Sequence, residues 1–216
     1  MGAERGEHGM DMAFEKAGEP ITEPVTKLGG QPVWLEEPTW PLSAETGNPM
    51  RFIGQFRLPG EAVRVGYLFM TGEEDGEWVD DTFLPDGGEN AFIVQPGGRI
   101  PAFYEVAAEA TGPTHGPDHR AVLSPHTPEP PDADDIAVAG EVGFEPEPKY
   151  GLGSRVGGRP GWLQGEEDPR EEGDWAFAVQ LDGCGLPFEV DFGDAGIGYA
   201  FHDEGTGEGR FFWQCC

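Results

Sequence analysis

The stretch TKLGGQPVWLEE, residues 26–37, returns with few changes as SRVGGRPGWLQGEE, residues 154–167. Two further phrases recur in the same order, and the three pairs are offset by 128, 125 and 132 residues. Only the loops between the phrases therefore differ in length. Three matches in one order predict a duplicated unit, because internal self-similarity is typical of repeated architecture. The other two pairs are FIGQF and FAVQL, at 52–56 and 177–181, and GYLFM and GYAFH, at 66–70 and 198–202.

Each copy of the Gly-Gly-x-Pro phrase predicts a turn followed by an apolar anchor. Glycine tolerates a positive φ and proline fixes its own φ, so the two residue types together favour a tight turn. The Trp-Leu pair that follows packs the turn against a core. We therefore expect a structural role for six residues: Gly29, Gly30, Trp34, Gly157, Gly158 and Trp162.

The segments 52–56 and 177–181 have the period of two that predicts β-strands, with their first, third and fifth residues on one face. Gln55 and Gln180 then occupy corresponding positions on the opposite face. A polar residue repeated in this way could face a ligand groove between two symmetric halves. It could equally cap the edge of a sheet. Both glutamines are candidate binding residues on the first interpretation.

These observations predict an α+β fold that is predominantly β, in which two strand-turn units pack with pseudo-twofold symmetry into one domain. The one short helix that we expect lies at 102–110, AFYEVAAEA. Proline-rich, acidic composition predicts a linker or a long surface loop between the units. The expected parts are a disordered or loosely packed segment at 1–25, a first unit at 26–110, an insertion or linker at 111–148 and a second unit at 149–216.

The chain of 216 residues carries 41 Asp and Glu against 13 Lys and Arg, a formal net charge of −28. Such a field repels phosphate backbones and anionic membranes, so we expect neither a nucleic acid nor a membrane as partner. It attracts divalent cations or a basic protein surface, or it serves only solubility or salt adaptation. The sequence shows no apolar signal segment. Its three cysteines are an odd number, which is a poor basis for a set of disulfides, so we expect the protein in the reducing cytoplasm.

Eight phrases also occur in a fixed order: KLGGQP with Trp34, TWP at 39–41, NPMRFIGQF at 48–56, LPG at 58–60, GYLFM at 66–70, WAFAVQLD at 175–182, FGDAGIGYAF at 192–201 and FFWQCC at 211–216. From about residue 26 to the end, the chain in this respect resembles the bacterial YwqG-like proteins, also called DUF1963. The resemblance implies a β-rich, internally duplicated single domain. It transfers no function and no catalytic residue. The chain departs from the pattern at Phe192, where Trp is expected, and in its acidic composition and Pro-rich insertion.

Motifs for catalysis and for zinc are weak. Cys184 could act as a thiolate beside His202, although a small apolar residue near a turn explains it more simply. His115, His119 and His126 lie close in sequence, but Gly116 and Pro117 prevent the helix that would align zinc ligands, so we expect loop residues.

Acidic, Gly-containing turns suggest calcium more than zinc, since Ca²⁺ takes six to eight oxygen ligands. The candidate ligands are Asp191, Asp194 and Asp203, although their spacing matches no EF-hand loop. Asp194 is also a candidate binding residue. As no catalytic motif is present, we expect a non-enzymatic, monomeric binding or adaptor module for a protein partner with a basic surface. The alternatives are a calcium-binding protein and an enzyme that uses carboxylates such as Asp194 and Glu189.

Overall fold

The computed structural model of the protein describes residues 9–72, 79–133, 136, 146–170 and 172–216. It is nearly all β, with 37% of the residues in strands and 3% in helices. The expectation of a predominantly β fold is therefore confirmed, whereas the helical part of an α+β fold is not.

One ten-stranded sheet and one two-stranded sheet contain the described strands. The strands of the large sheet are β1 (Met10–Lys16), β2 (Lys27–Leu28), β4 (Arg51–Arg57), β5 (Val65–Met70), β6 (Asn90–Gln95), β8 (His119–Pro125), β9 (Arg155–Val156), β10 (Trp175–Asp182), β11 (Ile197–Asp203) and β12 (Gly209–Gln214). β3 (Trp40–Leu42) and β7 (Glu105–Ala107) form the small sheet, and a 3-10 turn, η1, spans Gly183–Gly185. The order in the large sheet is β12-β11-β10-β9-β1-β8-β2-β4-β5-β6, and every neighbouring pair is antiparallel.

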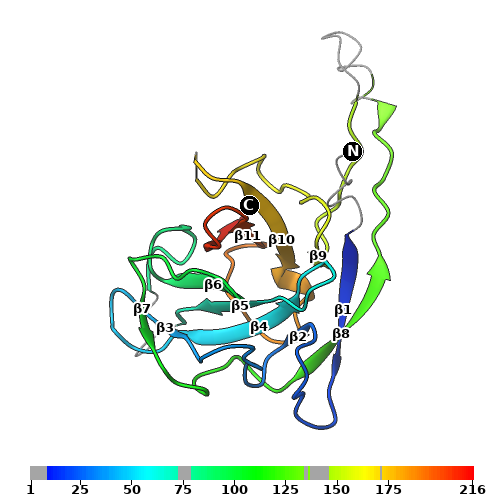
Figure 1. Ribbon diagram of the computed structural model, residues 1–216. Helices are drawn as coiled ribbons and strands as arrows, with labels where there is room; N and C mark the ends of the chain where they lie inside the picture. The colour runs from blue at the N-terminus through cyan, green and yellow to red at the C-terminus, as the bar shows by residue number, and fades with distance from the viewer. Residues whose placement is uncertain (1–8, 73–78, 134–135, 137–145, 171) are drawn as a thin grey trace.

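Strands β1 and β8 lie side by side at the centre of this order (Figure 1). β1 comes before the first Gly-Gly turn in the chain, yet it pairs with β9, which leads into the second turn. β8 comes before the second turn and pairs with β2, which leads into the first. Each half of the chain therefore contributes one strand to the other half, and the two halves cannot separate without breaking both pairings.

This exchange corrects two expectations. The segment 1–25 is not merely disordered or loosely packed, because residues 10–16 form β1, and the segment 111–148 is not only a linker, because residues 119–125 form β8. β1 has a short alternation in which buried Met12 is flanked by Met10 and Phe14, all packed on the core. β8 has no such alternation, and its pairing on both edges holds it in the sheet.

The sheet curls until its two edge strands, β6 and β12, contact one another, which leaves it nearly closed like a barrel. Arg99 N donates to the carbonyl oxygen of Gly207 over 2.9 Å just beyond these strands. A Cβ at Gly209 would lie 1.9 Å from the carbonyl oxygen of Phe92, so only glycine permits this close approach.

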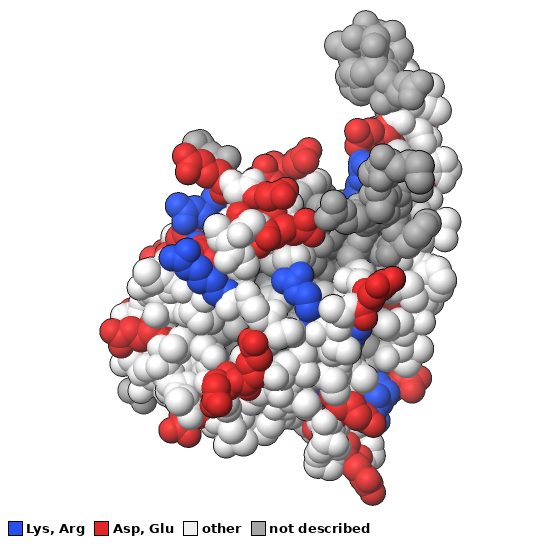
Figure 2. Space-filling view, in the orientation of Figure 1, with Lys and Arg blue, Asp and Glu red and all other residues white. Residues whose placement is uncertain are grey.

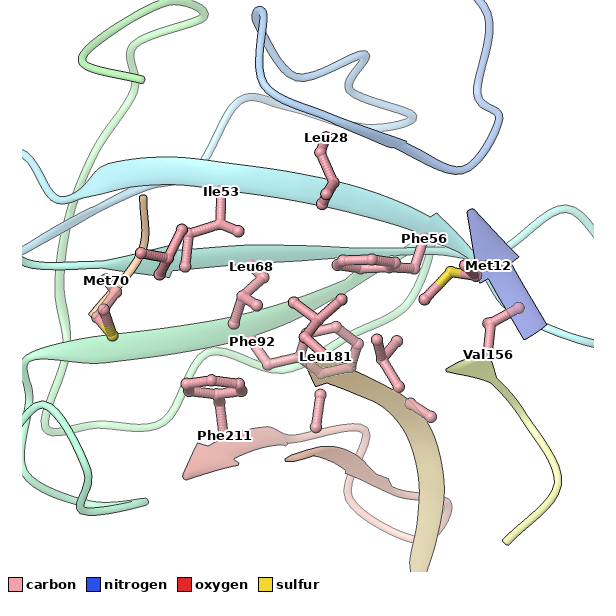
Figure 3. Packing of buried hydrophobic residues seen from close by; sticks show 14 of the residues in the cluster. Met12, Leu28, Ile53, Phe56, Leu68, Met70, Phe92, Val156, Leu181 and Phe211 are labelled. Atoms are coloured by element: carbon pink, nitrogen blue, oxygen red, sulfur yellow. The ribbon is translucent and has the colours of Figure 1, made fainter. Parts of the chain in front are cut away.

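The interior of the curled sheet is filled by a single hydrophobic cluster. Leu68 on β5 and Phe92 on β6 point toward Leu181 on β10 and Phe211 on β12 (Figure 3). These four side chains are at most 1% exposed. Burying side chains of this size stabilises a fold by about 1.5 to 3 kcal/mol each, so the packing of one half against the other is a main source of stability.

A β-bulge changes the faces expected for 52–56 and 177–181. The register of β4 against β5 shifts between Phe52 and Gly54, and that of β10 against β11 shifts between Phe177 and Val179. Phe52 and Phe177 consequently lie in clusters outside the barrel, whereas the later apolar residues of both strands fill the interior. A strict period of two was therefore wrong, because the extra residue of a bulge reverses the alternation.

The segment 102–110 forms no helix across its length. Its residues 105–107 are β7, which pairs with β3 through Trp40 and Ala107, among others. Tyr104, directly before β7, is buried and its hydroxyl donates to the carbonyl oxygen of Asn90 over 2.5 Å. Strand pairing and this anchor override the local helix propensity, which is a weak signal by comparison.

Candidate functional site

Gln55 is completely buried on the outer face of β4, where its amide holds the first Gly-Gly turn. Its Oε1 accepts a hydrogen bond from Val33 N at 2.8 Å. Its Nε2 donates to the carbonyl oxygens of Val25 at 2.9 Å and Glu23 at 3.2 Å. The side chain therefore satisfies three backbone groups that no strand partner satisfies.

Gln180 does the same on β10. Its Oε1 accepts from Gly161 N at 2.7 Å, and its Nε2 donates to the carbonyl oxygens of Gly153 at 2.9 Å and Gly151 at 3.2 Å. Like Gln55, Gln180 is 0% exposed. Neither glutamine lines the groove or the cavity described below, so the groove interpretation, one of the two that the sequence left open, has no support from their position. Each connects a strand to a turn through backbone groups.

The glycines of both turns have the backbone that the sequence predicts. The φ angles are 68° and 61° at Gly29 and Gly30, and 68° and 78° at Gly157 and Gly158. All four lie in the left-handed region that favours glycine. A Cβ at Gly29 would also lie 2.3 Å from the carbonyl oxygen of Pro117, just before β8.

The calcium candidates Asp191, Asp194 and Asp203 do not come together. Within the described ranges, no three or more His, Cys, Asp or Glu side chains are placed to hold a metal ion. Asp203 accepts from the backbone N of Thr206, Asp174 and Gly205, and these bonds lower the pKa of its carboxyl. Asp191 Oδ1 accepts from Gly193 N at 2.8 Å, and Asp194 is exposed.

Trp34 and Trp162 pack in the same way on tyrosines of the sheet, but their remaining contacts differ. Each lies 4.8 Å, between ring centroids, from its tyrosine, Tyr67 or Tyr199. Trp34 also meets Trp40 at 6.3 Å, and its indole N–H donates to the carbonyl oxygen of residue 110 at 3.0 Å. The indole N–H of Trp162 makes no hydrogen bond within the described part of the chain, and its aromatic neighbours there all belong to strands beneath it.

A groove of about 640 Å³ lies at Trp162, on the outside of the barrel. Its apolar lining includes the rings of Tyr150 and Trp162, two prolines, Pro148 and Pro160, and the 40% exposed Leu152. The two rings and the aliphatic side chains give the groove an apolar wall.

The polar lining of the groove is mainly acidic. Three exposed glutamates, Glu129, Glu147 and Glu166, line it. The two basic residues of the lining are engaged: Lys149 pairs with Asp132 at 2.7 Å, and Arg159 lies over the ring of Tyr150 at 6.0 Å. Figure 2 shows that Asp and Glu also outnumber Lys and Arg on the face that it presents. A cationic partner is therefore favoured at this groove.

A second hollow, of about 270 Å³, lies at one end of the barrel. Arg51 begins β4 and pairs with Met70 at the end of β5, which places both at this end. His115 approaches from the loop before β8, and Glu189 and Asp191 from the loop between β10 and β11. We call this hollow the barrel-end cavity. Thr71, Gly72, Val79 and Thr82 complete its lining.

His115 is the most perturbed titratable group in the barrel-end cavity. Burial, assisted by the positive charge of Arg51, lowers the pKa of its imidazole to about 4. Its Nδ1 lies 3.1 Å from the carbonyl oxygen of Glu189, which accepts the Nδ1 proton. Its Nε2 is buried and has no hydrogen-bond partner among the described residues. The ring is therefore neutral at pH 7, with an unused lone pair on Nε2.

We expect this histidine to make the fold sensitive to mild acid. The pKa in the folded state, about 4, lies below the unfolded value of 6.5. The unfolded chain therefore binds the extra proton, and the free energy of unfolding falls as the pH decreases through this window. At pH 4.5 the loss from this group is about 2 to 3 kcal/mol relative to pH 7. Urea unfolding of the wild type and of His115→Phe at both pH values measures it.

The comparison between the two proteins removes the effects of other groups. Arg51, Glu189 and Asp191 line the same cavity and are present in both. His202, whose pKa burial also lowers, is common to both as well. An equal fall in stability for the wild type and His115→Phe contradicts the assignment to His115.

The structure separates Cys184 from His202 and gives each of the three clustered histidines its own partner. Asp182 pairs with Ile197 and Ala176 with His202, so Cys184 and His202 lie at opposite ends of the β10–β11 pair and cannot act together. The three clustered histidines, His115, His119 and His126, have separate partners: Glu189, Pro117 and Asp11. All three were expected to be loop residues. His115 does lie in a loop, whereas His119 is the first residue of β8.

No known family model and no curated protein matches this chain. The resemblance to the YwqG-like proteins is accordingly a prediction from the sequence. Among the described residues, no helix has the length and apolar character required to span a bilayer.

Sequence reasoning named Asp191 and Glu189, as calcium and acid–base candidates, but it missed most of the other residues that line the groove and the barrel-end cavity. Arg51 directly precedes the recurring segment 52–56, and only its register with Met70 places it at the end of the barrel. Tyr150 and the glutamates of the groove come from segments that look like loops. Trp162 was expected to have only a structural role, yet it also lines the groove.

Proposed function

We propose that the protein is a non-enzymatic binding module that holds a basic, extended segment of a partner protein in the groove at Trp162. The observation that supports this most is the contrast between the two tryptophans. The indole N–H of Trp34 is occupied within the fold, whereas that of Trp162, which lines the groove, has no partner among the described residues. A large aromatic surface next to a groove marks an interaction site more often than a structural one.

The chemistry of the groove favours arginine and proline in the partner. Tyr150 and Trp162 offer ring faces on which a guanidinium or a pyrrolidine ring can lie, as Arg159 of the protein itself does over Tyr150. Glu129 and Glu166 supply the opposite charge. An extended Pro-rich segment loses little entropy on binding, because it is already close to its bound conformation.

The test is fluorescence polarisation with a labelled peptide in which arginine and proline alternate. We expect saturable binding that weakens as salt is raised, because the charge contacts are exposed. Tyr150→Ala, and the double variant Glu129→Gln/Glu166→Gln, should each weaken binding by about tenfold, which corresponds to the loss of roughly 1.4 kcal/mol. A peptide in which lysine replaces each arginine should bind less tightly, because lysine stacks less well on aromatic rings.

The matched control is Glu61→Gln/Glu109→Gln, which removes the same charge from exposed positions outside the groove lining. If this control weakens binding as much as the groove variants do, the peptide is held by the general negative field and the groove proposal fails. Absence of binding by the wild type at low salt also contradicts the proposal.

We also propose that the two halves descend from a duplicated unit. The matching contacts of Gln55 and Gln180 support this, as do those of two tyrosines. Tyr67 OH donates to Val33 O at 2.7 Å, and Tyr199 OH donates to Gly161 O at 3.0 Å. The pseudo-twofold arrangement, the monomeric state, the cytoplasmic location and the lack of a nucleic-acid or membrane partner stay predictions. No contact of the three aspartates favours the calcium alternative.

A further inference from the structure

The barrel-end cavity presents three kinds of chemistry within one small space. Arg51 brings a guanidinium that makes no ion pair with any described residue. His115 brings a buried Nε2 acceptor that also lacks a described partner. Glu189 and Asp191 bring carboxylates, while Met70 and Val79 supply apolar surface.

We propose that the barrel-end cavity binds a small α-amino acid in its zwitterionic form. The carboxylate of the ligand pairs with Arg51, and its ammonium group donates to His115 Nε2 and faces the carboxylates. The short side chain lies against Met70 and Val79. This site is separate from the groove at Trp162, so the inference does not depend on the proposed function.

The zwitterion fits better than a simple anion or a simple cation for two reasons. The formal net charge of −28 repels an anion from the protein as a whole, whereas a zwitterion carries no net charge. The cavity also holds both signs, so a cation would leave Arg51 without a counter-ion and an anion would lie against Glu189 and Asp191. A ligand that carries both charges satisfies each group.

The size of the cavity limits the ligand. Sites for drug-sized molecules occupy about 300 to 1,000 Å³, and this cavity has about 270 Å³. A free amino acid fits within this volume. The apolar part of the lining is small, which favours alanine, serine or valine within the class.

His115 is suited to bind a ligand N–H because of its fixed tautomer. The carbonyl oxygen of Glu189 accepts the Nδ1 proton, so Nε2 can only accept. A buried acceptor without a partner is unfavourable in the empty state, and a ligand donor removes that cost. Its low pKa supports the same reading, because the ring does not become a competing cation at neutral pH.

The test uses nuclear magnetic resonance of the full chain at pH 7, in which the His115 Nε2 signal reports directly on its hydrogen bond. L-Alanine, L-serine and L-valine are titrated to about 10 mM, ten times a millimolar dissociation constant. We expect a saturable shift of the His115 signal with at least one of them, and a dissociation constant from calorimetry that agrees. Propionate and alaninamide, which each lack one charged group, should bind at least tenfold more weakly than alanine.

Two variants test the assignment of the residues. Arg51→Gln should weaken binding at least tenfold and still fold, because Arg51 is exposed. Arg64→Gln, which changes an arginine directly before β5 and outside the cavity lining, should leave binding unchanged. No saturable shift with any of the three amino acids overturns the proposal. Equal binding of propionate, or an equal effect of the two variants, overturns it too.

Discussion

Replacing Asp118 by alanine will lower the free energy of unfolding by about 3 to 5 kcal/mol, because it leaves a buried charge without its counter-ion. The Lys27 side chain is 0% exposed, and its ammonium group contacts the carboxylate of Asp118, which is 10% exposed. The other partner of Nζ is the carbonyl oxygen of Gln31, at 2.7 Å. This carbonyl alone cannot neutralise an ammonium group inside the protein. Denaturation by urea at pH 7 measures the loss.

The double variant Lys27→Met/Asp118→Ala is the control for this prediction. It removes both charges, so we expect it to recover about half of the lost stability, since apolar replacement of a whole buried ion pair is often close to neutral. If the double variant is as unstable as Asp118→Ala, the loss comes from packing and the charge argument is wrong.

The pH dependence of Asp118→Ala supplies a further check. Burial lowers the pKa of Lys27 below its ordinary 10.5, and the hydrogen bond and charge of Asp118 oppose this effect. Without Asp118 the folded pKa falls further, so between it and 10.5 the unfolded chain binds more protons. The free energy of unfolding of the variant therefore rises with pH in this window, and its deficit against the wild type should shrink from pH 7 to pH 10.

The second large effect is expected from the buried glutamines. Gln55→Met should reduce the free energy of unfolding by about 3 to 5 kcal/mol, because it leaves the Val33 N–H and the carbonyl oxygen of Val25 without a partner and removes one of the two bonds to the carbonyl oxygen of Glu23. Methionine keeps the length of the side chain, so little of the loss comes from a cavity. Gln180→Met should have a similar effect on its own turn.

Thermal and urea unfolding of both variants measure these losses. The matched control is Gln31→Met: its amide also bonds backbone, with the N and O of Gly112, but the side chain is exposed. Water can replace those bonds, so we expect a loss below about 1 kcal/mol. A loss in Gln31→Met as large as in Gln55→Met contradicts a role for burial.

The groove at Trp162 follows from a difference between two segments that share a sequence phrase. The phrase places Trp34 and Trp162 on equivalent tyrosines. The small sheet of β3 and β7 supplies Trp40 beside Trp34, and the described residues provide no equivalent of it beside Trp162. The contrast depends on the elements that surround each copy of the phrase, which the phrase itself does not specify.

Much of the local structure follows from short-range chemistry. The positive φ angles of Gly29 and Gly157 follow from glycine followed closely by proline. The repeated position of Gln55 and Gln180 marked them as residues with a shared role, and both are buried and hold a turn. The expected faces of the strands failed at the bulges, since an extra residue is not visible in a pattern of period two.

The sequence by itself determined the β character, the two turns and the aromatic anchors, because each depends on residues within a few positions of one another. Only the tertiary structure decided the exchange of β1 and β8, the near closure between β6 and β12, and the placement of Arg51 beside His115. These features join segments far apart in the chain. Their stability comes from backbone pairing and shared burial, which depend on the whole fold and leave little trace in any one segment.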